Sequence, residues 1–189
     1  RWTFEKFPES DETLTTQMKS VGEAMSIGRT FKESFQKAIR SMEVKRFGFG
    51  LDKNDSWLRA SRGDEDVEWP IDEDTLIRKL SVPSQGRMFY IRYAMKTGWS
   101  IDRIYQLTSI DPWFLDQFSQ LVKFEDELTQ VKTLDEVSVD LMQKAKELGY
   151  SDPQLAFLYC GIISTETILQ VRNYRKSLGV EPVFKLVDT

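Results

Sequence analysis

The sequence contains no histidine and only one cysteine, and both absences restrict its chemistry. Without histidine, the chain cannot form a Ser-His-Asp triad, and it lacks a principal ligand of zinc. Cys160 cannot form an internal disulfide, and no imidazole is available to activate it as a nucleophile. We therefore interpret Cys160 as a small buried apolar residue, which fits a reducing compartment.

Long apolar runs and strong basic clusters are also missing. No apolar stretch approaches the roughly 20 residues needed to span a bilayer, and no signal peptide is recognisable. The 26 basic and 30 acidic side chains give a net charge of −4, whereas tight nucleic-acid binding relies on clustered positive charge. The densest local group, Arg40, Lys45 and Arg46, is interpreted as a solvated helix end. We expect neither a membrane nor a nucleic acid as partner.

What is present suffices for one packed domain. The hydrophobic content is 40%, with 12% aromatic residues, so a core can form without a disulfide or a metal. The chain opens at Arg1 inside an aromatic-rich run and closes on an extended-looking stretch ending at Thr189. Both ends lead us to expect a piece of a longer polypeptide.

Helical periodicity dominates from Thr30 onward, while residues 1–29 show none. Thr30 followed by Glu33 predicts a capping box, and Asp111 followed by Pro112 predicts a strong helix start. The predicted helices span 30–43, 72–80, 84–97, 101–108, 111–129, 134–148, 152–160 and 165–178. The longest strand-like alternation is only Val183 to Val187. The prediction is an all-α fold, an irregular bundle of about eight short helices with a non-helical N-terminal segment.

The polar, glycine-bearing stretch 44–70 is interpreted as a long connector, either a mobile segment or an insertion that varies within the family. It contains the acidic group Asp64, Glu65, Asp66 and Glu68. A second acidic group, Glu125 to Glu127, is consecutive and therefore fans around its helix. Catalytic carboxylates need a buried, perturbing environment, so both groups are interpreted as solvated faces.

The segment Met18 to Arg29 offers glycines and basic residues just before a helix. A phosphate-binding P-loop needs four residues between its glycines and then a lysine, but five separate Gly22 from Gly28, and Arg29 follows. Nucleotide binding by this segment is therefore not expected. On the best-capped helix, Trp113, Phe114 and Phe118 are interpreted as core together with the cap Asp111. The predictions contain no catalytic residue and no metal ligand.

Two turns resemble one another. Gly98-Trp-Ser and, 51 residues later, Gly149-Tyr-Ser each follow one helix and open another. This pattern indicates either a duplicated helix–turn–helix unit or two instances of ordinary capping. It also keeps open an alternative function, a free-standing helical adaptor or a helix-turn-helix module that binds nucleic acid.

The stretch Leu14 to Arg40, with Met18-Lys-Ser-Val-Gly-Glu-Ala-Met-Ser-Ile-Gly-Arg29 at its centre, closely resembles the large chain of carbamoyl phosphate synthetase. Three further motifs follow in the order and approximate spacing of that family. They are Leu107-Thr-Ser-Ile-Asp-Pro-Trp-Phe-Leu115, Gly149-Tyr-Ser-Asp152 and Val183-Phe-Lys-Leu-Val-Asp-Thr189. The resemblance covers the whole chain and is weakest across 44–70.

This resemblance implies a domain layout. Residues 1–40 correspond to the C-terminal tail of the first, carboxyphosphate-forming ATP-grasp half, and residues 41–180 to a helical oligomerisation domain. Residues 181–189 correspond to the linker to the second half. The family's ATP and metal ligands lie outside this segment, so the resemblance implies a non-catalytic scaffold without a cofactor of its own.

The resemblance also implies the parent enzyme. That enzyme is a cytoplasmic ligase of bacterial or plastid type, serving arginine and pyrimidine biosynthesis. It makes carbamoyl phosphate from bicarbonate, glutamine-derived ammonia and ATP, with Mg²⁺ or Mn²⁺ and K⁺. The implied partners are a second copy of the helical domain, the neighbouring ATP-grasp domains and a glutamine amidotransferase small chain.

The resemblance also implies roles for individual residues in two places. Met18, Lys19, Ser20, Gly22 and Arg29 mark the seam between the synthetase half and the helical domain. Glu23 matches a glutamate on the internal route of carbamate between the halves, or it braces the loop through backbone hydrogen bonds. From the residues alone, Leu76 and Leu80 are the predicted self-association surface, because their short helix lies between loops and has little core to fill.

Overall fold

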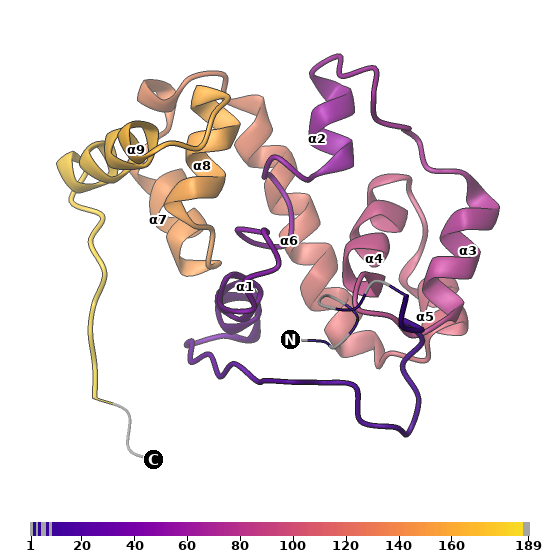
Figure 1. The fold of residues 1–189 in the computed structure, drawn as a ribbon. Coiled ribbons are helices and arrows are strands. Elements are labelled where there is room, and N and C mark those ends of the chain that lie inside the picture. Colours follow the sequence, from indigo (N-terminus) through magenta and orange to yellow (C-terminus); the bar gives the residue numbers. More distant parts are fainter. Residues whose placement is uncertain (1, 3, 5–6, 8, 187–189) are drawn as a thin grey trace.

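The described chain is built from α-helices around one long central helix. In the computed structural model, which describes residues 2, 4, 7 and 9–186, these residues form nine α-helices and one 3₁₀-helix, without a sheet. In chain order they are α1 (Phe31–Ser41), α2 (Ser56–Ser61), α3 (Glu73–Ser81), α4 (Arg87–Lys96), α5 (Ile101–Thr108), α6 (Pro112–Gln130), η2 (Leu134–Glu136), α7 (Val139–Glu147), α8 (Asp152–Cys160) and α9 (Thr165–Ser177). Figure 1 shows α3–α5 on one side of α6 and α7–α9 on the other. The predicted all-α fold is confirmed.

Side-chain caps fix most helix starts where the sequence places them. The Asp111 carboxylate accepts the Trp113 N–H at 2.8 Å, and Pro112 supplies the first helical residue of α6. At α1 the Thr30 hydroxyl accepts the Glu33 N–H at 3.2 Å. The Glu33 carboxylate, however, accepts the N–H of Arg29 at 2.7 Å, so the predicted capping box is only half formed.

The helix predicted over 134–148 is interrupted. The 3₁₀-turn η2 ends at Glu136, and Val137 takes an extended conformation with ψ of 114°. The Ser138 hydroxyl then accepts the Leu141 N–H at 3.2 Å and starts α7. A serine at this position offers the backbone a new cap, which breaks a pattern that otherwise looks continuous.

The prediction of a mobile connector at 44–70 is wrong. Phe49 and Leu51 are completely buried in the core and Leu58 nearly so, and α2 lies inside the stretch. Gly48 and Gly50 allow the backbone to pass close to other core groups. A Cβ atom at Gly50 would lie 2.2 Å from Nε of Arg92. Composition misleads here because several polar side chains of the stretch point inward and are paired.

An ionic cluster inside the core holds this stretch in place. Arg92 lies between Asp55 and Glu125, and all three side chains are completely buried. Its Nη2 is 2.7 Å from Asp55 Oδ2 and also 2.7 Å from Glu125 Oε2. Lys96 adds a second cation, 3.3 Å from Glu125. The predicted solvated role of Glu125 is therefore wrong.

Arg46 also departs from its prediction as part of a solvated helix end. Its Nε donates to the buried carboxylate of Asp52 at 2.9 Å, and its guanidinium lies over the Phe89 ring, 4.1 Å from the centroid. Burial raises the pKa of Asp52, although Arg46 opposes that rise. The pair therefore forms part of the interior.

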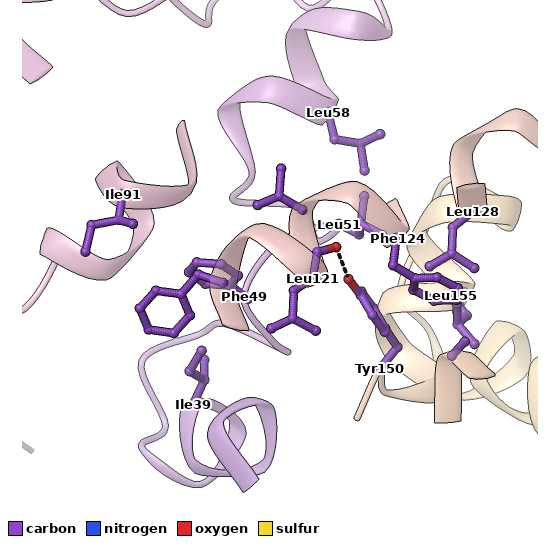
Figure 2. Packing of buried hydrophobic residues seen from close by; sticks show 14 of the residues in the cluster. Ile39, Phe49, Leu51, Leu58, Ile91, Leu121, Phe124, Leu128, Tyr150 and Leu155 are labelled. Carbon is purple, nitrogen blue, oxygen red and sulfur yellow. Dashed lines mark hydrogen bonds between the residues drawn. The ribbon is translucent and has the colours of Figure 1, made fainter. Parts of the chain in front are cut away.

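The central helix joins the two flanking groups of helices. Figure 2 shows Leu121, Phe124 and Leu128 of α6 among the labelled core residues, with the Tyr150 hydroxyl bonded to the Leu121 carbonyl. That hydrogen bond measures 3.0 Å, and the Tyr159 hydroxyl makes a similar one to Leu128 at 3.0 Å. On the other side, α6 packs against α4 and α5.

The two similar turns share one backbone geometry. Gly98 and Gly149 both adopt φ of 89°. The N–H of the next residue returns to the carbonyl of a buried alanine, Trp99 to Ala94 and Tyr150 to Ala145, each at 3.0 Å. This is a Schellman helix ending. The turns therefore repeat in structure, while duplication of a larger unit stays a hypothesis.

No single helix in the described part of the chain is long and apolar enough to cross a membrane. Only α8 and α9 taken together pass the length and composition test, and they are bent by 103°.

Candidate functional site

The segment ahead of α1 runs at the edge of the helical domain (Figure 1) with apolar side chains exposed. Met18 is 81% exposed, Met25 88% and Val21 61%. Figure 1 shows this segment running along the edge of the helical domain before it enters α1. Adjacent exposed apolar side chains are typical of a surface that another protein part covers.

The seam residues hold this segment in shape. Lys19 donates to the carbonyl of Thr13 at 2.7 Å and pairs with Asp11 at 3.2 Å. Ser20 forms an isolated antiparallel bridge with Trp2. Gly28 lies so close to the first turn of α1 that a Cβ atom there would be 2.7 Å from the Ser34 amide nitrogen. The backbone at Gly28 thus turns into α1 without room for a side chain.

Glu23 lies in the exposed part of this segment. Neither a hydrogen bond nor an ion pair of its carboxylate is observed among the residues that the structure describes. Bracing of the loop by Glu23 is therefore not seen among the described residues. The carboxylate is free to face whatever covers the segment.

The aromatic residues at the start of α6 form an exposed cluster with α1. Phe31 lies 5.5 Å from Trp113 and 5.2 Å from Phe114 between ring centroids, in edge-on arrangements. Trp113 is 52% exposed and Phe114 40%, so the prediction that both belong to the core is wrong, whereas Phe118 is buried as predicted. Both exposed rings lie in the first turn of α6 and contact the edge of α1 through Phe31. The cap Asp111 does bond to the helix start.

Comparison with known proteins identifies the family. The family model described as carbamoyl-phosphate synthetase large chain, oligomerisation domain, matches residues 23–179. The chain belongs to this family. The carbamoyl phosphate synthase large chain of Rhodopirellula baltica is 52% identical over 189 residues, that of Archaeoglobus fulgidus is 44% identical over 192, and the arginine-specific chloroplastic large chain of Arabidopsis thaliana is 44% identical over 189.

All of this chain is aligned in each case, but it spans only 16% of the first two relatives and 14% of the third. The family match begins at Glu23, inside the exposed segment. These matches give no support to the alternative of a free-standing adaptor or nucleic-acid-binding module. The chain contains the oligomerisation domain of such a large chain, matched over residues 23–179, and the predicted boundaries at 40 and 180 stay predictions.

Leu76 and Leu80 do not form a surface of this oligomerisation domain. Both side chains point into the protein, with exposed fractions of 1% and 0%. Their helix α3 packs against α4 and α5, so these leucines fill core that the sequence did not reveal. A self-association contact through these two side chains would require the helix to detach, and the prediction is corrected accordingly.

Reactive groups are sparse in this domain. No cluster of three or more potential metal ligands occurs among the described residues. Cys160 is partly exposed rather than fully buried, and its thiol lies 3.8 Å from the Gln170 side-chain oxygen. Burial raises the pKa of the Cys160 thiol, which keeps it in its less reactive protonated form.

The tail after α9 is extended and exposed. Val183 is 70% exposed and Phe184 90%, and residues 181–186 form no helix or strand. The strand-like pattern of Val183 to Val187 therefore has no partner over its described part. Residues 187–189, which end the family-like motif and the predicted linker, lie outside the described residues.

Proposed function

We propose that this chain serves as the self-association and interdomain scaffold of a carbamoyl phosphate synthase large chain. The observation that carries the proposal is the family match across residues 23–179, together with full-chain alignment to much longer large chains. The parent would combine bicarbonate, glutamine-derived ammonia and ATP, with Mg²⁺ or Mn²⁺ and K⁺, through domains outside this chain. Its small chain, a glutamine amidotransferase, would supply the ammonia.

In the proposed layout, residues 1–40 complete the first synthetase half, 41–180 form the helical domain and 181–189 lead into the second half. The exposed segment ahead of α1 and the exposed tail after α9 support this arrangement. Both present apolar side chains to solvent, which is costly unless another domain covers them. The aromatic cluster of Phe31, Trp113 and Phe114 is a further exposed apolar surface that another protein part could cover.

Self-association is tested by sedimentation velocity on the 189-residue chain from low to high micromolar concentration. We expect a concentration-dependent shift from monomer to a larger species. A constant monomer across that range would contradict self-association by this chain. The same measurement on Trp113→Ser would show whether the aromatic cluster faces a second copy or a different domain.

The seam is tested by methionine oxidation with hydrogen peroxide, read by mass spectrometry. Met18 and Met25 should oxidise fast in this chain and slowly in the complete large chain, because a neighbouring domain would then cover them. Met142 is completely buried and serves as an internal control that stays protected in both. Equal oxidation of Met18 and Met25 in the two proteins would place the segment on a free surface instead.

Glu23 is proposed to line the route that carbamate takes between the synthetase halves. Its exposure within this chain leaves the carboxylate available to such a route. In the complete large chain, Glu23→Gln should lower carbamoyl phosphate formation more than bicarbonate-dependent ATP hydrolysis. Glu12→Gln removes the same charge from another exposed position of the segment and should leave both unchanged. A parallel fall of both activities would favour a structural role.

A further inference from the structure

A cavity of about 590 Å³ opens between α1, α7, α9 and the C-terminal tail. Its lining includes five cationic side chains, Arg29, Lys37, Arg40, Lys146 and Arg175, and three carboxylates, Glu33, Glu147 and Glu181. The tail leaves α9 and descends past α7 and α1, as Figure 1 shows. The proposed roles in self-association and domain linkage use none of Lys37, Arg40, Lys146 and Arg175.

Two of the cations, Lys146 and Arg175, share the single carboxylate of Asp152. Lys146 lies 2.7 Å from Asp152 Oδ1, and Arg175 lies 3.2 Å from Asp152 Oδ2. Arg40 donates from Nη1 to the Gly149 carbonyl at 2.6 Å, and within the described residues no carboxylate is at salt-bridge distance from it. The inner part of the cavity therefore carries more positive than negative charge.

The remaining charges at the cavity are already engaged. Glu33 binds Lys37 at 2.6 Å and also accepts the Arg29 N–H. Glu147 accepts a hydrogen bond from Gln143 at 2.7 Å, and Glu181 lies 3.9 Å from Lys176. Among the described residues, none of these carboxylates is at salt-bridge distance from Arg40, although Asp152 and Glu33 act on its charge through space and partly oppose the lowering of its pKa by burial.

The titration of the inner cations agrees with this geometry. Burial lowers the pKa of Lys146, Asp152 opposes that effect, and Arg175 and Arg40 add to the lowering. Burial likewise lowers the pKa of Arg40. Cations that are desolvated and repel one another are stabilised by an anion that accepts their hydrogen bonds.

We propose that this cavity is an oxyanion site, in which Arg40, Lys146 and Arg175 bind a phosphate or carboxylate group. The guanidinium of Arg40 has five N–H donors, and one of them is used by Gly149. The planar guanidinium suits paired oxygens of either group, and the ammonium of Lys146 supplies a compact charge beside it. The oxyanion comes from a free small molecule or from an acidic side chain of the parent enzyme.

The experiment titrates the isotope-labelled 189-residue chain with inorganic phosphate at constant ionic strength, with chloride in parallel. We expect saturable NMR shifts at the amides of Gly149 and Tyr150 and at the Arg40 side chain, and none with chloride. A second titration with malonate in place of phosphate compares the binding of carboxylate groups with that of phosphate. The absence of shifts at these groups, or equal shifts with chloride, would overturn the proposal. This test uses the unsubstituted chain, so it does not depend on the folding of any variant.

Arg40→Gln should weaken phosphate binding about tenfold, the loss typical of one charge-assisted contact. Arg62→Gln is the matched control. Arg62 also donates to backbone carbonyls, those of Phe157 and Leu158 at 2.9 and 2.7 Å, and burial also lowers its pKa, but it lies outside the cavity. Equal phosphate affinity of Arg40→Gln and the unsubstituted chain would contradict the assignment.

The same titration on the complete large chain separates the two sources of the oxyanion. A site for a free anion binds phosphate in both proteins. A site filled by an acidic side chain of a neighbouring domain binds phosphate only in the 189-residue chain. Both results require binding to this chain, so failure of the oxyanion site remains distinct from failure of the proposed scaffold role.

Discussion

The guanidinium of Arg92 and the carboxylate of Asp55 face each other through two hydrogen bonds inside the core, Nη1–Oδ1 at 2.8 Å and Nη2–Oδ2 at 2.7 Å. Asp55 also accepts the N–H of Leu51 at 2.8 Å. Burial by itself lowers the pKa of Arg92, but Asp55 and Glu125 outweigh it and raise that pKa well above the ordinary value. This ion pair therefore holds the polar stretch before α2 against α4. The guanidinium of Arg92 stays protonated.

Replacing Arg92 with Met should destabilise the domain by about 3–5 kcal/mol, because Asp55 would stay buried without a cation and Glu125 would keep only Lys96. Urea unfolding followed by circular dichroism measures the free energy of unfolding. Arg172→Met is the control, since Arg172 is exposed on α9 and should change stability by about 0.5 kcal/mol or less. Similar losses in the two variants would show that the buried cluster contributes little.

Gly50→Ala should cost about 1–3 kcal/mol, because the new Cβ atom would meet the Arg92 guanidinium and displace it. Gly86→Ala is the matched substitution: its backbone is right-handed and its Cβ atom would meet only Tyr90, at 3.8 Å. We expect Gly86→Ala to change stability by about 1 kcal/mol or less. Thermal unfolding of both variants measures the difference, and equal midpoints would contradict the close approach at Gly50.

The two similar turns should respond unequally to alanine. Gly98→Ala places a Cβ atom in open space at φ of 89°, which costs about 1–2 kcal/mol for the left-handed backbone. Gly149→Ala has the same φ, but its Cβ atom would also lie 3.0 Å from the Glu33 Cα atom on α1. We therefore expect the larger loss at Gly149, measured by urea unfolding. Equal losses would mean that α1 shifts freely.

Asp152 should contribute stability that disappears in acid. Burial alone would raise its pKa, but Lys146 and Arg175 outweigh this effect and hold the pKa below 3.8. The folded state then binds fewer protons than the unfolded state between the two pKa values, so stability is present above the unfolded pKa and falls as the pH drops through the folded one.

Asp152→Asn should accordingly lower the free energy of unfolding at about pH 7 by about 1–3 kcal/mol, and the gap should narrow toward about pH 3. Urea unfolding across that range measures the gap. Asp140→Asn changes an exposed position of α7. Its free energy of unfolding should depend on pH in the same way as that of the unsubstituted chain. If the difference in free energy of unfolding between Asp152→Asn and the unsubstituted chain stayed constant with pH, the pairing of Asp152 with Lys146 and Arg175 would be contradicted.

The sequence predicts the helices well because their ends are set by neighbouring residues. Asp111 caps α6 through the amide two residues on, and Ser100 caps α5 through the amide three residues on. Such bonds need no distant partner, so a pattern of a few residues is sufficient to identify them. Two helix starts were not predicted, at Ser138 and at Asp55, where the cap bonds are equally local but the surrounding pattern suggested a continuous helix or a loop.

Burial is where sequence patterns mislead. Leu76 and Leu80 look like the exposed face of an isolated short helix, yet α4 and α5 cover them. Trp113 and Phe114 look like core but are exposed in the first turn of α6. In the candidate site, the motif around Glu23 is recognisable from sequence. The grouping of Arg40 with Lys146 and Arg175 is not, because more than one hundred residues separate them.

By itself the sequence determined the family, the helical class and the helix starts, since each depends on residues close together in the chain. Only the tertiary structure decided that Glu125, Asp55 and Asp52 are interior residues. A carboxylate is buried or solvated according to whether a cation is present across the core, and here Arg92 and Arg46 are present. That through-space pairing turns an apparently mobile polar stretch into part of the scaffold.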